Sequence, residues 1–493
     1  MRQRRSCRLF ISAAIVFLAV LAATFYLGHL AGDGPLLPPP VLPELDAFVP
    51  AFYDLQLSLE PEIATLHGVS RVAYTNNEDV SLGELYFHLY PNAEIFSAAA
   101  ERPGRLTVQG VRLDERPLSF STAGTLLKIP LPVNLAPGEK AALELTWDLV
   151  IPDYPGRLGE KDGVISLGNW YPILAVYDEE GWHLDPYIER GDPFYSDVGC
   201  YRVRLRLPDA YRAAATGNLR SARDLPGPSK EMAWESGIVR DFALALSPHY
   251  RTLTDKTGPV LVQSYFPADK KEGGRVALNA GCAALEFFSQ TFGPYPYDQF
   301  TLAATGFYQG GMEYPNIVFL SQQFYGPEDA ETLEYVAVHE TAHQWWYGVV
   351  GNNQVVEAWL DEGLTEFSTL LFYEKERGGG RGQTSAVLSL YEAYRQANGD
   401  GAILQRLDEF PSELAYNALV YGKGCMLFLA LREKLGEDVL LKVLREYYQR
   451  YAYRTATTAD FIRVAQEVSS LELAGFFQHW LHNGDNTQRR SAS

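Results

Sequence analysis

The spacing of apolar residues changes once along the chain, and this change limits what the chain can fold into. From about Ala47 to about Leu253, segments such as YDLQLSLE and CYRVRLRLP alternate apolar with polar residues, with Gly, Pro, Asn and Asp between them, which predicts antiparallel strands. From about Val260, segments such as RVALNAGCAALEFFSQTFG carry apolar residues at helical spacing. The sequence therefore predicts an α+β protein, with an antiparallel β domain over 47–253 and a mainly helical domain over 254–485.

The charge balance excludes one class of partner. The 493 residues include 42 Lys plus Arg and 61 Asp plus Glu, and the net charge of -19 would repel nucleic-acid phosphates over most of the surface. We therefore expect no nucleic-acid partner. A negative field attracts cationic ligands such as free amino groups, although acidity alone does not select a substrate.

The first residues are typical of a membrane anchor. Four arginines within residues 1–8 precede an uncharged run over 9–28 that is long enough to cross a bilayer, so residues 1–30 are expected to hold a cytoplasmic end and one transmembrane helix. The run is longer than a usual signal-peptide core and no clean A-x-A site follows it, which favours an uncleaved anchor over a removed signal. A proline-rich spacer is expected over 31–46. The folded part would then lie outside the cytoplasm, tethered to the cell membrane by a single pass, and a polar tail over 486–493 would end the chain.

The cysteines predict no disulfide scaffold. The chain has four, and Cys7 lies before the apolar run, so at most one disulfide could form in the main body. Cys200 and Cys425 lie among apolar and aromatic neighbours, and we interpret them as small buried hydrophobic side chains rather than redox or metal groups.

Two histidines one helical turn apart are the first sign of chemistry. His339 and His343, in VAVHETAHQWW, would lie on one face of a helix with Glu340 beside them. Because this short pattern also arises by chance, it needs a third ligand, and Glu362 in AWLDEGLTEF is available after eighteen intervening residues, on a second helix packed beside the first. Two imidazoles and one carboxylate are the ligands of an open zinc site in hydrolases, whereas calcium and magnesium prefer oxygen ligands alone, so we expect one Zn²⁺ ion.

These segments resemble a known family. HETAHQWWYG, WLDEGLTEF, GGMEYPN and VYGKG are similar to motifs of the gluzincin zinc aminopeptidases of the alanyl aminopeptidase and leukotriene hydrolase type. The similarity runs from the β domain through FGPYPYDQF to TTADFIRVAQEV and FFQHWL, and so covers nearly everything after the spacer. The resemblance implies a short two-domain metallopeptidase with a thermolysin-like catalytic domain over 254–485. Its function would be the zinc-dependent hydrolysis of N-terminal residues from peptides with a free N-terminus.

The resemblance implies roles around the metal. His339, His343 and Glu362 match the family's zinc ligands, and Glu340 matches the general base that takes a proton from the attacking water. Tyr421 matches the tyrosine whose hydroxyl stabilises the oxyanion formed during the reaction. Two further residues are candidates for the site. These are Tyr416, as a second tyrosine near the substrate, and Glu366, which would orient His339 from behind or else be an ordinary solvated helix residue.

The resemblance also implies a substrate strand. Glu313, in GGMEYPN, matches the glutamate that binds the free α-amino group, and Gly310, Gly311 and Met312 would let the backbone approach the substrate as an edge strand. The sequence departs from the common GAMEN form, with Gly311 in place of Ala and Tyr314 in place of Asn. The contact made by that Asn is therefore not predicted here, while the glutamate is retained.

Other positions stay open. The aromatic pair Trp345 and Trp346 is interpreted as core packing rather than a substrate platform. The GNWYP segment, with Asn169 and Trp170, differs from the family and has no assigned role. The roofing domains of larger relatives have no residues left to form them after FFQHWL, so we expect a more open cleft.

Two alternatives to an aminopeptidase remain. The first is a thermolysin-like endopeptidase with the same zinc chemistry, from which Glu313 would distinguish this chain, because an enzyme that depends on a free amine fails on N-acetylated peptides. The second is a catalytically silent, membrane-tethered peptide-binding protein, which the full set of ligands, base and tyrosine disfavours.

Overall fold

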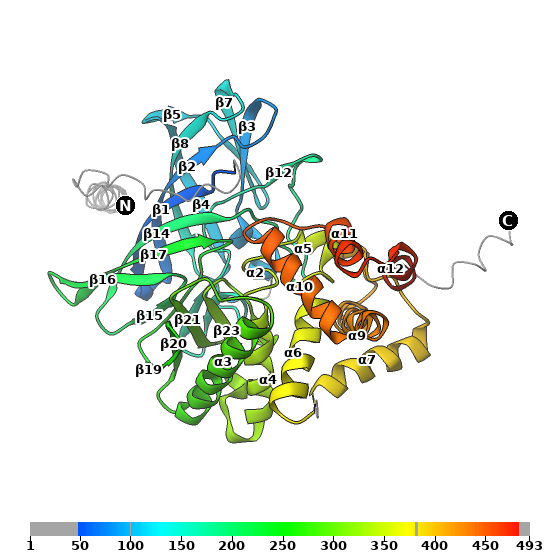
Figure 1. Cartoon of the computed structure of the whole chain (residues 1–493). Coiled ribbons are helices and arrows are strands. Elements are labelled where there is room, and N and C mark those ends of the chain that lie inside the picture. The colour runs from blue at the N-terminus through cyan, green and yellow to red at the C-terminus, as the bar shows by residue number, and fades with distance from the viewer. Residues whose placement is uncertain (1–47, 99, 380–382, 483–493) are drawn as a thin grey trace, which may run out of the picture.

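The computed structural model describes residues 48–98, 100–379 and 383–482, and it shows a β-rich first half followed by a mainly helical second half (Figure 1). This confirms the predicted order of the two parts. The predicted membrane span, the spacer and the polar tail lie outside the described residues.

The largest sheet of the first half has eight strands. In sheet order they are β16 (Asn218–Leu225), β17 (Ser229–Val239), β14 (Gly199–Pro208), β1 (Ala51–Glu60), β2 (Thr65–Thr75), β8 (Lys140–Val150), β4 (Arg105–Leu113) and β5 (Arg116–Leu118). Along β8 every second side chain, including Leu143, Leu145 and Leu149, is buried, which is why alternation predicted a strand. Neighbouring strands pair antiparallel, as predicted, except that β1 and β14 run parallel, which corrects the expectation of a purely antiparallel domain.

Smaller sheets complete the first half. One four-stranded sheet contains β15 (Arg212–Ala215), β18 (Leu244–Ser247), β10 (Val164–Leu167) and β9 (Leu158–Lys161). A second contains β11 (Ile173–Leu174), β3 (Leu82–His88), β7 (Leu126–Leu135) and β6 (Ser121–Ala123). The strand β12 (Tyr177–Asp178) pairs with β13 (Gly181–Trp182), and the short helix α2 spans Ile95–Ala98. The core beneath these sheets also contains Met312, Tyr314 and Ile317 of the second half. The two halves therefore share buried surface next to the GGMEYPN segment.

A five-stranded sheet opens the second half. Its order is β19 (Tyr250–Thr257), β20 (Val260–Pro267), β21 (Gln299–Thr305), β23 (Ile317–Ser321) and β22 (Gly311–Met312). The strand β22 lies at the edge, antiparallel to β23, as expected for a segment that a substrate backbone could extend. The boundary between the two domains, which the sequence placed between residues 253 and 254, falls within the strand β19. The boundary therefore stays a prediction.

Helices make up the rest of the second half. They are α3 (Lys271–Thr291), α4 (Ala330–Ala342), α5 (Gln354–Glu357), α6 (Glu362–Glu376), α7 (Gln383–Asn398), α8 (Glu413–Tyr416), α9 (Gly424–Leu435), α10 (Glu437–Tyr451), α11 (Thr458–Ser469) and α12 (Ala474–Leu481). The helix α3 packs against β19, β20 and α4, and α4 packs against α6. The interpretation of Trp345 and Trp346 as core residues is confirmed, since each is 1% exposed. Cys200 and Cys425 are likewise buried, and neither forms a disulfide within the described residues.

One helical stretch among the described residues, Glu413–Leu435, is long and apolar enough to cross a membrane. It joins α8, the π-helical segment η6 (Asn417–Lys423) and α9, and 67% of its most apolar window is buried inside the protein. Because Leu419, Cys425 and Phe428 belong to the core of the second half, we interpret this stretch as a core helix.

Candidate active site

The end of α4 carries the two predicted histidines. His339 lies in its last turn and His343 follows as the C-terminal cap, with the amide of His343 donating to the carbonyl of His339 at 3.3 Å. Their ring centroids are 5.0 Å apart, and both side chains are buried together with Glu340. The i, i+4 spacing has therefore placed both rings on one side of the helix end.

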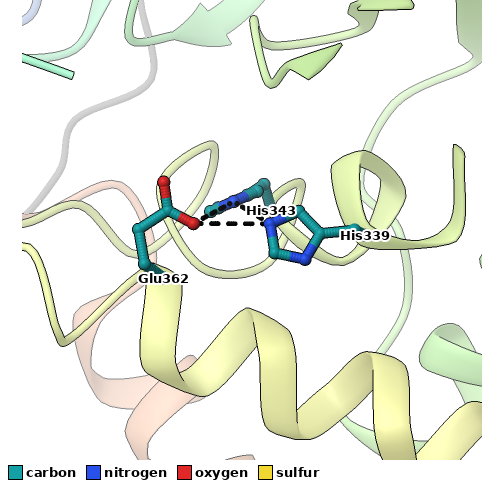
Figure 2. A group of neighbouring side chains, drawn as sticks. All are labelled: His339, His343 and Glu362. Atoms are coloured by element: carbon teal, nitrogen blue, oxygen red, sulfur yellow. Dashed lines mark hydrogen bonds and ion pairs between the residues drawn. The ribbon is translucent and has the colours of Figure 1, made fainter. Parts of the chain in front are cut away.

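Glu362 is the first residue of α6, which packs against α4. Figure 2 shows its carboxylate directed toward both imidazoles. Its Oε2 lies 3.3 Å from Nε2 of His339 and 3.2 Å from Nε2 of His343, and the two Nε2 atoms are 3.3 Å apart. The structure thus brings the three predicted ligands together.

The second nitrogen of each imidazole faces an acceptor. Nδ1 of His339 lies 3.1 Å from Oε2 of Glu366, which places Glu366 behind the ring, as predicted. Nδ1 of His343 lies 3.0 Å from the carbonyl oxygen of Trp346 and 3.1 Å from the hydroxyl of Thr365. Because a carbonyl can only accept, this Nδ1 carries a proton, which leaves Nε2, the nitrogen that faces Glu362, as the one available to a metal ion.

Such an arrangement of lone pairs fits a metal ion. Two imidazole nitrogens and a carboxylate at separations of 3.2–3.3 Å need either protons or a cation between them, and neutral rings whose Nδ1 atoms carry the protons leave room for a cation. The corners of a tetrahedron around a metal with bonds of about 2.0 Å are about 3.3 Å apart. The separations match that geometry, and the two nitrogens and one oxygen suit zinc better than calcium or magnesium.

Glu340 lies beside these ligands and against the edge strand. A Cβ atom placed on Gly311 would come within 2.3 Å of Oε1 of Glu340, so the Ala of the common family motif would require the Glu340 side chain to move. Oε2 of Glu340 has no hydrogen-bond partner among the described residues. Burial raises the pKa of Glu340 to about 7, which suits a group that must take up and release a proton near neutral pH.

The two predicted tyrosines lie on and next to a π-helical segment. Tyr421 is in η6 and donates its hydroxyl to Oε1 of Glu362 at 2.7 Å, while Tyr416 ends α8 just before η6. Residues five apart lie on the same side of a π-helix, and the two rings meet edge to face with centroids 5.8 Å apart. The buried hydroxyl of Tyr416 has no hydrogen-bond partner in the described part of the chain, and it faces Gly191, where a Cβ atom would lie 2.5 Å from it. Both tyrosines therefore adjoin the ligands.

Glu313 follows β22 directly. Gln354 donates to its Oε1 at 3.0 Å and to Oδ2 of Asp361 at 2.7 Å, which links Glu313 to the start of α6. Burial, followed by the neighbouring carboxylate of Asp192, raises the pKa of Glu313. A positive charge beside Glu313 would counter both effects, as expected for a residue that binds an ammonium group.

Asp192 is a site residue that the motifs did not indicate. It comes from the first half, between β13 and β14, yet its carboxylate oxygen lies within 4.8 Å of those of Glu313 and Glu362. Arg157 holds it by donating from Nη1 to Oδ1 at 2.5 Å. The same Nη1 lies 3.4 Å from the sulfur of Met312. The side chain of Met312 is buried in the core and does not lie among the other predicted site residues.

The two departures from the family pattern meet in the structure. The hydroxyl of Tyr314 donates to Oδ1 of Asn169 at 2.8 Å, and Nδ2 of Asn169 donates to Oδ2 of Asp241 at 2.7 Å. The fit is tight, because a Cβ atom on Gly168 would lie 1.8 Å from that hydroxyl. Asn169 therefore ties the segment that carries Glu313 to the first half, while Trp170 is fully buried in the core.

Comparison with known proteins agrees with this geometry. Residues 276–480 match the Peptidase family M1 domain. This match covers most of the second half of the chain. Every site residue that the motifs predicted lies within this match, whereas Asp192 and Asn169 lie before it.

Curated relatives of the M1 type match a larger part of the chain. Aminopeptidase M1-D of Oryza sativa subsp. japonica is 25% identical over 389 residues, which cover 70% of this chain and 43% of that protein. Leukotriene A-4 hydrolase of Xenopus laevis is 24% identical over 385 residues, which cover 72% of this chain and 60% of that protein. The chain thus spans about half the length of these relatives.

A solved structure shares the fold of both halves. The crystal structure of an M1 zinc metallopeptidase from Deinococcus radiodurans superposes with a TM-score of 0.65 and 20% identity, covering 88% of this chain and 94% of that one. Another, of a mutant two-domain M1 zinc metallopeptidase bound to L-arginine, gives a TM-score of 0.64 and 19% identity, with 88% and 95% covered. The β-rich half and the helical half are therefore combined in the same way in these solved structures.

Proposed function

We propose that this chain is a zinc-dependent aminopeptidase that removes N-terminal residues from peptides. The observation that carries the proposal is the position of two buried carboxylates, Glu313 and Asp192, within 4.8 Å of the candidate ligand Glu362. A free α-ammonium held by this pair would place the first peptide bond beside the metal ligands. The M1 domain and the names of its curated relatives support the same activity.

His339, His343 and Glu362 would hold the zinc ion. When bound, zinc would polarise the scissile carbonyl and make water more acidic. The protein supplies the remaining chemistry. Glu366 orients His339, and the carbonyl of Trp346 orients His343.

Each remaining residue has a separate task in the reaction. Glu313 and Asp192 bind the ammonium group, and the edge strand β22 aligns the substrate backbone. Glu340 takes a proton from the attacking water as the C–O bond forms, and then passes that proton to the departing amine as the C–N bond breaks. The hydroxyl of Tyr421 donates to the carbonyl oxygen as that oxygen gains negative charge.

We further propose that a single N-terminal span holds the enzyme at the cell membrane with the M1 domain outside the cytoplasm. The support is the sequence of residues 1–30, in which arginines precede an uncharged run. Protease treatment of intact cells tests this orientation, because the M1 domain should be digested without lysis. Protection in intact cells would overturn the orientation.

The change Glu340→Gln tests the proposed base. We expect the variant of the full-length chain to keep one zinc per chain, because Glu340 is not among the ligands, and to lose about 10²–10⁴-fold in kcat on an aminoacyl-arylamide. Glu331, exposed on the same helix, offers the matched control Glu331→Gln, which should keep full activity. Unchanged turnover in Glu340→Gln would remove the proposed mechanism.

A further inference from the structure

A hollow of about 320 Å³, counting its open mouth, adjoins the amine-binding end of the site. Both halves of the chain contribute aromatic side chains to its wall. These are Phe96, Tyr154 and Tyr187 from the first half and Phe307 and Tyr308 from the second. The proposed mechanism uses none of them.

The hollow is next to both groups that would hold the first residue of a peptide. Gly191 and Gln309 line it, and they immediately precede Asp192 and the glycines of the edge strand. Arg157 also lines it, and its guanidinium reaches Asp192 at 2.5 Å and the carbonyl oxygen of Gly191 at 3.1 Å. An ammonium group between Asp192 and Glu313 would therefore leave the attached side chain close to this hollow.

We propose that the hollow receives the side chain of the N-terminal residue and that the enzyme prefers an aromatic residue there. This inference rests on the proposed aminopeptidase function and names its substrate class. A ring packed among aromatic walls gains the burial of a large apolar surface and edge-to-face contacts, neither of which a methyl group provides.

Charge in the wall disfavours a basic first residue. The guanidinium of Arg157 is 6% exposed and lies 5.0 Å from the ring centre of Phe194 and 5.8 Å from that of Phe307. A second cation in the same space would meet this charge at close range. Glu189, the acidic residue of the lining, is exposed, so water and salt screen its attraction for a cation.

Tyr308 is the wall residue best suited to mutation. Tyr308 is 50% exposed, so the loss of its side chain removes little core packing. Its loop is held by the backbone amide of Tyr308, which donates to the carbonyl of Pro155, and by the side-chain amide of Gln323, which donates to the carbonyl of Tyr308. Tyr308→Ala should shrink the aromatic wall, and Tyr308→Phe should retain it. Tyr211, a half-buried tyrosine outside the hollow, provides the control Tyr211→Ala.

The test compares kcat/KM of the full-length enzyme on Phe-, Ala-, Leu- and Arg-arylamides. We expect Phe to exceed Ala about 10²-fold and to exceed Leu and Arg at least threefold. Tyr308→Ala should lower the Phe-to-Ala ratio at least fivefold, Tyr308→Phe should restore it, and Tyr211→Ala should leave it unchanged.

Equal or faster turnover of Ala, Leu or Arg substrates would overturn the aromatic preference while leaving the aminopeptidase function intact. A Phe-to-Ala ratio that Tyr308→Ala does not alter would overturn the placement of the side chain in this hollow. Failure to cleave any of the arylamides would overturn both the function and the inference.

Discussion

The two ends of the candidate site are built in different ways. The metal-binding end uses His339, His343 and Glu362, which come from two adjacent helices of one half. The amine-binding end joins Glu313 of the second half to Asp192 of the first. The difference shows that the metal ligands depend on local helix geometry, whereas recognition of the amine depends on how the two halves meet.

The largest expected effect lies at the metal-binding end. His343→Ala should lose both zinc and nearly all turnover, because two ligands hold the ion far more weakly than three. Metal analysis and an arylamide assay on the same sample measure both losses. The exposed His249 provides the control His249→Ala, and retention of zinc in His343→Ala would contradict the ligand assignment.

The amine-binding end should respond differently. Glu313→Gln should keep zinc and lose about 10- to 100-fold in kcat/KM on free-amine substrates, because one charge of the ammonium clamp is gone. Asp192→Asn should act in the same direction, which only a contribution from the first half explains. The exposed Asp224 offers the control Asp224→Asn. Full activity of Asp192→Asn would confine amine binding to the second half.

The same contrast explains what the sequence could predict. The ligands, Glu340 and Glu366 follow from helical spacing, and Tyr416 and Tyr421 were indicated by family motifs. Asp192 has no such signal, since only folding brings it beside Glu313. Alternation predicted the strands of the first half, but the parallel pairing of β1 with β14 is a long-range choice that alternation does not encode.

A smaller effect is expected where the two halves are tied together. Tyr314→Phe would leave Oδ1 of Asn169 without its donor and should cost about 1–3 kcal/mol of stability. Because the segment carrying Glu313 would loosen, KM should rise a few-fold with little change in kcat. Tyr250→Phe is the matched control, since it removes another buried hydroxyl bond, to Ala304, away from the site. An equal rise of KM in both variants would show that Tyr314 has no positioning role.

The smallest effect concerns pH. Burial raises the pKa of Asp241 to about 7, against hydrogen bonds from Tyr171 and the Phe242 amide that lower it. The folded state therefore holds this proton more tightly than the unfolded state, and stability falls as pH rises from about 4 to about 7. In Asp241→Asn this part of the pH dependence should vanish, so the difference in melting temperature between the two proteins should change over that range. Parallel curves would contradict the raised pKa.

The dependence on a free amine tests the account most directly. The full-length enzyme would be given one peptide in two forms, with a free or an acetylated N-terminus, and the products would be identified by mass spectrometry. We predict that the free peptide loses its first residue and that the acetylated peptide stays intact, because Glu313 and Asp192 then have no ammonium group to bind. Internal cleavage of the acetylated peptide at a similar rate would contradict the account and indicate an endopeptidase.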